Sequence, residues 1–381
     1  MKLDINKFLF FVSYTLILIS YTFKQVLFLN DTFFNVIYYI PIILLIILFL
    51  YQNFYIKKPI NKKSLIILTI LFILGVISSI TINNTIFLRT FLFICTFRNI
   101  KFDDFIKYDA IVRIVFVITL FVLYCFDLTE VVEIYRAGGV LRYAFGFWHP
   151  NKFGLYLMLI SIDLVYLFYK SPTTKKRIIL SVLIALFAFI VYFYSKSRAS
   201  FCIILCCLIL LLFNQKYIFK LIQIKPINFL AKNSVLILTI ITFLLIGLYR
   251  QNNIIAEKID SISSERLYWA STYLENYDLN LFGNEIQTFS SVEVIDGQKY
   301  FSLDNSFVHF TLYYGVIIMS VIVLMFRAIF KTLYGKKKYI HIICLVLIII
   351  YSFMESILFK FYYNPFLLLF NYVLFNEDEW F

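Results

Sequence analysis

Charged residues are scarce in this chain. Only 15% of the residues are Asp, Glu, Lys or Arg, whereas 62% are hydrophobic and 20% are aromatic. This composition excludes a water-soluble globular protein. Acidic residues are scarcer than basic ones. The chain contains 22 Asp and Glu against 35 Lys and Arg, so its net charge is +13. The basic residues form no continuous patch, so this charge does not indicate nucleic-acid binding.

Glycine and proline are rare as well, with 10 Gly and 6 Pro in 381 residues. An average usage of about 7% would give about 27 glycines. Transporters often contain broken helices rich in Gly and Pro, so the shortage argues against a transporter. The argument counts only in part, because the abundance of Ile, Asn, Lys and Phe suggests an AT-rich genome, which also depletes glycine.

Residue patterns typical of metal sites are absent. The six cysteines lie within or at the edges of predicted membrane spans and lack metal-ligand spacing, which indicates inert packing. The predicted outer loops contain no Asp-x-Asp pair. The sequence therefore gives no support for an enzyme that binds a nucleotide-sugar substrate through a metal ion. We therefore expect neither a metal nor a cofactor.

Apolar runs long enough to cross a bilayer, about 20 residues in a helix, recur from end to end. They predict an all-α, polytopic transmembrane helix bundle of about twelve spans, forming a single integral membrane domain over residues 1–381. The first run lacks an Ala-x-Ala-like cleavage site, so we expect an uncleaved first helix. The predicted spans are 8–29, 33–51, 64–82, 85–97, 108–127, 152–169, 178–194, 199–213, 234–249, 305–326, 340–358 and 361–375.

The distribution of Lys and Arg predicts the orientation. Placing the N- and C-termini in the cytoplasm makes alternate loops basic, as the positive-inside rule requires. Residues 250–304 then form a large extracytoplasmic loop, with nine acids against four bases. We therefore expect a multi-pass membrane protein with both termini in the cytoplasm.

The loop 250–304 contains two local patterns. A helical repeat places Ile259, Ile262, Arg266, Trp269 and Tyr273 on one face. The helix is expected either to lie on the membrane interface or to form a lid over a site. Farther along the loop, Asp296-Gly297 between short β-prone runs predicts a hairpin.

Ionisable residues within predicted spans are costly and need an explanation. Arg113 and Asp163 lie in consecutive antiparallel spans and are expected to pair. Arg198 permits two interpretations, a snorkelling arginine at the interface or a forked donor for phosphate oxygens. Six polar residues fall at one depth near the outer side, as a site reached from the outer leaflet would need: Arg89, Arg142, His149, Arg198, Asp304 and Glu355.

Four short stretches stand out from the apolar background. "GFWHPNKFG" (146–154) predicts a helix start, with Trp148 at the interface, Pro150 excluding a preceding helical turn and Asn151 as the cap. It is followed by "SKSRAS" (195–200), "ERLYWASTYLENYDLNLFGNE" (265–285) and "LDNSFVHFTLYYG" (303–315).

Taken in this order, the four stretches resemble the superfamily of bacterial membrane glycosyltransferases that contains O-antigen polymerase (Wzy) and O-antigen ligase. The resemblance covers roughly residues 136–325. It implies a metal-independent, inverting transfer at the outer face of the cytoplasmic membrane. The glycan of one undecaprenyl-pyrophosphate-linked oligosaccharide would pass to another lipid-linked repeat unit of an O-antigen, capsule or exopolysaccharide.

The resemblance also implies roles for individual residues. Arg198 and Arg266 would bind the pyrophosphate of the donor, while His149, Asn151 and the pair Asp304-Asn305 would line the same cavity. Arg89 and Arg142 are further substrate-binding candidates because of their depth. Ligases are expected to carry a His directly before the Asn of the last motif, and Asp304 at that position favours a polymerase. Asp304 is the first candidate for the general base, followed by His149 and Glu355.

Pyrophosphate is a stable leaving group, so the transfer needs positive charge on it and a base for the attacking hydroxyl. The partners implied are donor and acceptor undecaprenyl-pyrophosphate-linked oligosaccharides, membrane lipid, a chain-length regulator and a flippase, without nucleic acid. Three alternatives stay open. The chain would otherwise be a flippase or transporter of lipid-linked sugars, a ligase-type transferase to a different acceptor, or a purely structural membrane protein.

Overall fold

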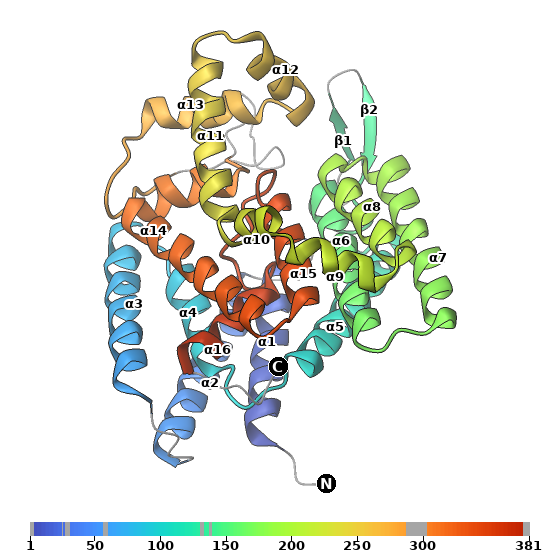
Figure 1. Ribbon diagram of the computed structural model, residues 1–381. Coiled ribbons are helices and arrows are strands. Elements are labelled where there is room, and N and C mark those ends of the chain that lie inside the picture. The colour runs from blue at the N-terminus through green and yellow to red at the C-terminus, as the bar shows by residue number, and fades with distance from the viewer. Residues whose placement is uncertain are drawn as a thin grey trace. The chain divides into compact units, whose positions relative to one another are not determined.

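Helices form nearly all of the regular structure of the chain (Figure 1). The structure is a computed structural model that describes residues 4–24, 26, 31–55, 60–129, 133–136, 139–286 and 303–375. This part of the chain contains sixteen α-helices and one antiparallel pair of four-residue strands. The all-α prediction is confirmed, with this strand pair as an addition. The hairpin predicted at Asp296-Gly297 lies outside the described residues.

The chain divides into two compact units. Unit 1 comprises Met1–Pro59, Cys95–Leu221 and Glu377–Phe381, and unit 2 comprises Ile60–Ile94 and Ile222–Asn376. The prediction of a single domain is not tested by this division. Unit 1 contains the following elements: α1 (Ile5–Phe23), α2 (Asp31–Leu50), a π-helical turn (Tyr51–Tyr55), α5 (Phe102–Cys125), β1 (Glu133–Arg136), β2 (Val140–Tyr143), α6 (Pro150–Lys170), α7 (Thr174–Ile190), a second π-helical turn (Val191–Ser195) and α8 (Arg198–Leu212).

Unit 2 holds the loop and C-terminal motifs. Its elements are α3 (Lys62–Thr81), α10 (Lys225–Lys232), α11 (Ser234–Arg250), α12 (Ile254–Ser263), α13 (Arg266–Asn276), α14 (Ser306–Gly335), α15 (Tyr339–Tyr351), a 3-10 turn (Pro365–Leu369) and α16 (Phe370–Phe375). Two further helices contain the boundaries between the units, α4 (Ile86–Thr96) and α9 (Gln215–Gln223).

The helix α6 is the core of unit 1. It packs against α5, α7 and α8, and 83% of its most apolar 18-residue segment is buried. Its sequence is apolar on nearly all sides, as expected for a helix surrounded by others. By contrast, α7 is only 22% buried and exposes a row of large hydrophobic side chains, which include Ile178, Val182, Leu186 and Phe189. An exposed row of this kind suits contact with lipid.

Seven of the described helices are long and apolar enough to cross a membrane, and the number rises to nine if two bent helix pairs each form one span. The predicted count of about twelve is not confirmed. Three predicted spans coincide instead with short apolar helices, Ile86–Thr96, Tyr339–Tyr351 and Pro365–Phe375. At 1.5 Å per residue, helices of this length fall well short of a hydrocarbon core of about 30 Å.

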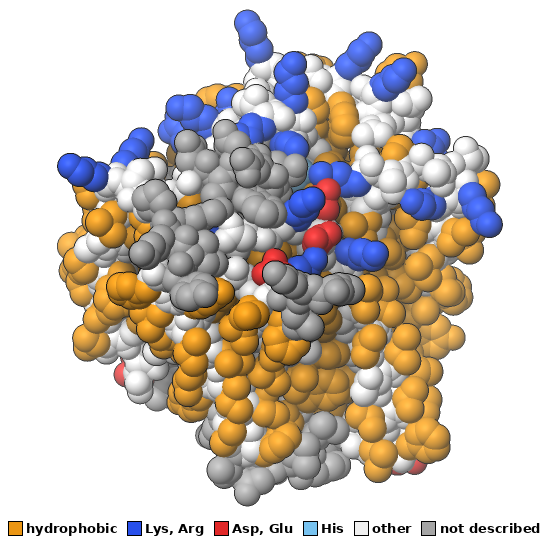
Figure 2. All heavy atoms as spheres, turned by 90° about the horizontal axis from the view of Figure 1, so that it is seen from below, with side chains coloured by type: hydrophobic (Ala, Val, Ile, Leu, Met, Phe, Trp, Pro, Cys, Tyr) orange, Lys and Arg blue, Asp and Glu red, His pale blue; other side chains and the backbone are white. Residues whose placement is uncertain are grey.

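Large hydrophobic side chains cover broad areas of the surface (Figure 2). Soluble monomers rarely expose continuous apolar patches larger than a few hundred Å². The exposed side chains include residues of α2, α3, α5 and α7, all of which contain a candidate span. These helices therefore indicate a multi-pass membrane protein.

In unit 2, α14 has a break at Gly315, where φ is 87° and ψ is 166°. The segment "NLFG" (280–283) fills this break. Val316 and Ile317 donate backbone hydrogen bonds to the carbonyl oxygens of Asn280 (3.1 Å) and Leu281 (3.2 Å). In return, the N–H of Asn284 donates to the Leu312 oxygen at 3.0 Å. The loop motif and the last motif of the sequence thus form one interlocked structure.

The amphipathic helix predicted around residues 259–273 consists of two helices. Ser264 and Glu265 both adopt left-handed backbone conformations, which end α12 and begin α13. The Asp260 carboxylate then accepts the first N–H groups of α13, from Leu267 (2.7 Å) and Tyr268 (3.1 Å). The predicted single helix was wrong because this local carboxylate offers the backbone an alternative to a continuous helix.

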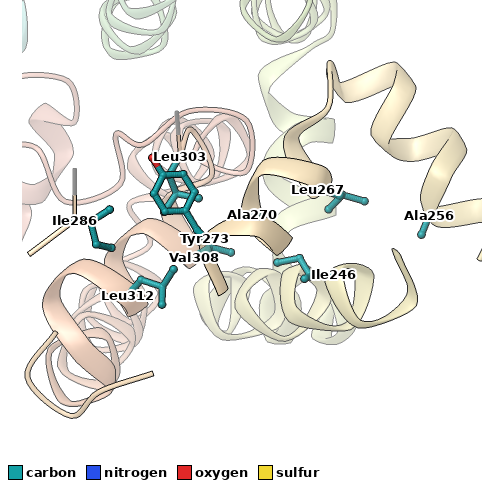
Figure 3. Close-up of a cluster of buried hydrophobic side chains, with 9 residues drawn as sticks. All are labelled: Ile246, Ala256, Leu267, Ala270, Tyr273, Ile286, Leu303, Val308 and Leu312. Atoms are coloured by element: carbon teal, nitrogen blue, oxygen red, sulfur yellow. The ribbon is translucent and has the colours of Figure 1, made fainter. Parts of the chain in front are cut away.

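The face of α13 that carries Leu267, Ala270 and Tyr273 is buried in a cluster of hydrophobic side chains (Figure 3). These three residues, spaced by three, follow the helical period. The cluster is completed by residues of α11, α12, α14 and the neighbouring loop: Ile246, Ala256, Ile286, Leu303, Val308 and Leu312. This packing holds Arg266, the first residue of α13, in a defined place.

Candidate functional site

The start of α6 in unit 1 is capped by His149. Its Nδ1 atom accepts the N–H of Asn151 at 3.0 Å, and Pro150 occupies the first helical position. The prediction that Asn151 is the cap was therefore wrong. Proline needs no hydrogen-bond acceptor for its nitrogen and suits the first position of a helix, so the helix begins at Pro150, two residues earlier than a cap at Asn151 would allow.

Asn151 has a different role, as the partner of Arg142. The Nη2 group of Arg142 donates to the side-chain oxygen of Asn151, and its Nε group donates to the backbone oxygen of Ser195 at 2.9 Å. Arg142 is only 5% exposed. One guanidinium thus joins β2, the start of α6 and the end of the second π-helical turn. These bonds give Arg142 and Asn151 a structural function.

The motif "SKSRAS" packs directly against α6 at Gly154. A Cβ atom at position 154 would lie 2.8 Å from the Cβ of Ser197 and 3.0 Å from the Oγ of Ser200. Glycine is therefore required for this close approach. The next residue after Ser197, Arg198, begins α8 and is exposed. The first two motifs thus place an accessible guanidinium beside the capped start of α6.

A buried charged cluster connects α1, α5 and α6. Arg113 lies 2.9 Å from Asp109 on its own helix and donates to the Tyr14 hydroxyl at 3.0 Å. That hydroxyl in turn donates to Asp109 at 2.6 Å. The direct ion pair of Arg113 is with Asp109, one turn away on the same helix face, while the predicted partner, Asp163, lies close enough to interact with Arg113 electrostatically. Asp163 is 1% exposed, and its carboxylate accepts no hydrogen bond from an N–H or O–H group of the described residues.

Unit 2 brings Arg266, Asp304 and Glu355 together. The Nη2 atom of Arg266 lies 3.2 Å from Glu355 and 3.6 Å from Asp304. The side chains of Arg266 and Glu355 are 15% and 6% exposed, while that of Asp304 is 28% exposed. Burial by itself lowers the pKa of Arg266, but the two carboxylates outweigh it and raise the pKa above its ordinary value. The guanidinium therefore stays charged.

The remaining amino group of Arg266, Nη1, is buried and has no hydrogen-bond partner among the described residues. A guanidinium offers five N–H donors in a planar fork. Leaving a buried donor unsatisfied costs about 1–3 kcal/mol. A ligand that accepts a hydrogen bond from Nη1 would remove this cost.

Two neighbours of Asp304 hold the site in shape. The side-chain oxygen of Asn305 caps α14 by accepting the N–H groups of Phe307 (2.9 Å) and Val308 (3.2 Å), while its amide donates to the Phe353 oxygen at 2.9 Å. The Ser306 hydroxyl donates to the backbone oxygen of Glu355 at 2.6 Å. Asn305 therefore positions its neighbours, because its side chain is occupied by the backbone.

His309 is a candidate that the sequence reasoning missed. It follows Asn305 by one helical turn, and its ring stacks on Tyr313 at a centroid distance of 5.2 Å. Its Nδ1 atom is buried and has no hydrogen-bond partner among the described residues. The ammonium of Lys360 lies close enough to interact with it electrostatically. The available signal was a histidine, one of three in the chain, inside the last motif.

The chain matches no protein-family model, curated protein or solved structure.

The predicted site residues thus fall into two groups. Arg142, His149 and Asn151 are brought together in unit 1, with Arg198 on the motif that packs against α6. Unit 2 brings together Arg266, Asp304, Asn305 and Glu355. Arg89, also in unit 2, lies on α4 and is 6% exposed. The cavity predicted to combine residues of both groups stays a prediction.

Proposed function

We propose that the chain is a polysaccharide polymerase of the bacterial cytoplasmic membrane. It transfers the glycan of an undecaprenyl-pyrophosphate-linked oligosaccharide onto another lipid-linked repeat unit at the outer face. The observation that carries this proposal is the cluster of Arg266, Asp304 and Glu355 in unit 2. It joins the loop motif that contains Arg266 to the last motif, which contains Asp304, and it pairs a partly exposed carboxylate with a buried guanidinium.

Asp304 is the general base in this proposal. It is the more exposed of the two carboxylates and is held by Arg266 at 3.6 Å. In the reaction, the acceptor hydroxyl oxygen attacks the anomeric carbon of the donor, and the bond from that carbon to the pyrophosphate oxygen breaks. The hydroxyl proton passes to Asp304, and undecaprenyl pyrophosphate leaves as an anion. Such base catalysis contributes typically about 10²–10⁴-fold to the rate.

The two arginines have different tasks. The charge of Arg266 is compensated by Glu355 and Asp304, both of which contact Nη2, so its buried Nη1 donor is left for the substrate. Arg198 is exposed at the start of α8, and its guanidinium suits the leaving pyrophosphate. In unit 2, Arg266 therefore orients the base and contributes a donor, and the pyrophosphate role of Arg198 in unit 1 rests on its motif and its exposure.

Deletion of the gene distinguishes a polymerase from a flippase. A polymerase deletion should leave single repeat units exposed outside the cytoplasmic membrane, and no longer chains. Single units that accumulate on the inside would contradict the proposal. A ligase is distinguished by its product, because a polymerase leaves the lengthened glycan on undecaprenyl pyrophosphate.

Conservative variants test the site itself. Arg266→Lys keeps the positive charge beside Glu355 but loses the planar, forked guanidinium. We expect normal membrane insertion of this variant and a loss of polymer of at least about tenfold, which is the equivalent of one hydrogen bond to a charged group. Arg198→Ala removes the guanidinium altogether and should abolish polymer. The matched control is Arg327→Lys, at an exposed position of α14, which should leave chain length unchanged. Wild-type chain length in both site variants would refute the assigned roles.

A further inference from the structure

A cavity of about 390 Å³ that is wide open to the surface lies at the end of α11, and no residue of the Arg266 cluster lines it. It is built by three segments that are close in sequence: the last turn of α11, the turn that follows it and one face of α13. Its volume falls within the range of small-molecule sites, about 300–1,000 Å³. The lining residues are Tyr249, Arg250, Asn252, Tyr268, Ser271, Thr272 and Glu275.

One side of the cavity is held by a hydrogen-bonded chain. Arg250 donates from Nε to the Ser271 hydroxyl at 3.0 Å and from Nη2 to the Ser271 backbone oxygen at 2.9 Å. The same hydroxyl donates to the Glu275 carboxylate at 3.2 Å, and Arg250 lies 3.8 Å from that carboxylate. These bonds fix a guanidinium and a carboxylate side by side on the wall.

Several polar groups of the lining are available to a ligand. Within the described residues, the hydroxyls of Tyr249 and Tyr268, the amide of Asn252 and the Nη1 group of Arg250 have no hydrogen-bond partner. The set contains both donors and acceptors. The two tyrosines also present aromatic rings, and Tyr268 is 44% exposed.

We propose that this cavity binds a sugar ring of a neutral saccharide. A sugar carries many hydroxyls that both donate and accept, which matches the mixed lining, while its C–H faces match the tyrosine rings. The lining contains one arginine and one glutamate, so their charges cancel. This balance disfavours a phosphate or pyrophosphate group, which would need an excess of positive charge.

The proposal deepens the proposed function, because a second sugar contact on α13 would hold the glycan while its end reaches Asp304. The binding itself does not depend on catalysis. A saccharide can therefore bind here even if no polymer is formed, and the failure of either proposal can be recognised separately.

The test uses the full-length protein in lipid nanodiscs, because the headgroup of a maltoside detergent would compete. The probes are a panel of neutral mono- and disaccharides, including galactose, N-acetylglucosamine and N-acetyllactosamine, with inorganic pyrophosphate as the anionic probe. Saturation-transfer NMR measures binding. The variants are Tyr268→Ala and Glu275→Gln, each with a matched control outside the cavity, Tyr217→Ala (70% exposed) and Glu285→Gln (exposed in the loop after α13).

We expect at least one saccharide to bind the wild type, with affinity about tenfold lower in both cavity variants, a difference of about 1.4 kcal/mol. The control variants should bind as the wild type does. Three results would overturn the proposal: no saccharide of the panel binds, the cavity variants bind as well as their controls, or pyrophosphate displaces the saccharide.

Discussion

Replacing Gly315 by alanine tests whether the break in α14 and the segment "NLFG" stabilise each other. The backbone at Gly315, with φ 87° and ψ 166°, lies in a region that is essentially restricted to glycine. A Cβ atom there would lie 2.3 Å from the Leu281 oxygen and 2.5 Å from the Gly283 nitrogen. Both atoms belong to the backbone, so neither can move aside without displacing the whole segment.

The expected loss follows from these contacts. An unfavourable backbone conformation costs about 1–3 kcal/mol. Displacing the segment also weakens the three backbone hydrogen bonds that join it to α14, each worth about 0.5–1.5 kcal/mol. We expect the free energy of unfolding to fall by about 3 kcal/mol or more. At the usual ratio of Tm change to free-energy change for a unit of this size, this loss lowers Tm by about 6–12 °C.

Differential scanning fluorimetry of the purified protein measures this change. The matched control is Gly247→Ala in α11, where a Cβ atom would meet nothing within 4 Å. Alanine is the better helix former by about 0.8–1.0 kcal/mol, so the control should keep or slightly raise Tm. An unchanged Tm in Gly315→Ala would show that the two segments do not depend on each other.

Three further predictions concern unit 1. Asp109→Asn should lower Tm by the equivalent of about 3–5 kcal/mol, because Arg113 loses its buried ion pair. Asp163→Asn should lower Tm far less. Equal losses of Tm in the two variants would contradict the assigned pairing. Arg142→Ala should lower Tm by the equivalent of about 2 kcal/mol, because two buried hydrogen bonds are lost. Arg198→Ala should keep the wild-type Tm and lose polymer, and a matching loss of Tm would assign Arg198 a structural role.

Local features of the fold were largely predictable from the sequence. Long apolar runs predicted the long helices, and "GFWHPNKFG" predicted the start of α6. The cap residue was assigned wrongly because both His149 and Asn151 can cap a helix, and only the position of Pro150 decides between them. The span count was not confirmed, because hydropathy does not register that helices such as α4 and α15 end after 11 and 13 residues.

The site was predictable only in its parts. Arg266 and Glu355 lie 89 residues apart, and no local pattern predicts their contact. The loop motif indicated Arg266 as a candidate and the predicted depth indicated Glu355, yet their mutual distance depends on the packing of α13. The pair of Arg113 with Asp109 was accessible from the sequence, since a spacing of four places both on one helix face. His309 was also accessible, one turn beyond the cap of α14.

The central claim is tested most directly by the purified protein in liposomes that contain an undecaprenyl-pyrophosphate-linked repeat unit, with a metal chelator present. Products are separated by length, and released undecaprenyl pyrophosphate is quantified. The proposed polymerase should produce lipid-linked chains longer than one repeat unit, with one undecaprenyl pyrophosphate released for each new glycosidic bond, and Asp304→Asn should abolish both. Repeat units that stay unjoined, whether or not they cross the bilayer, would contradict the account.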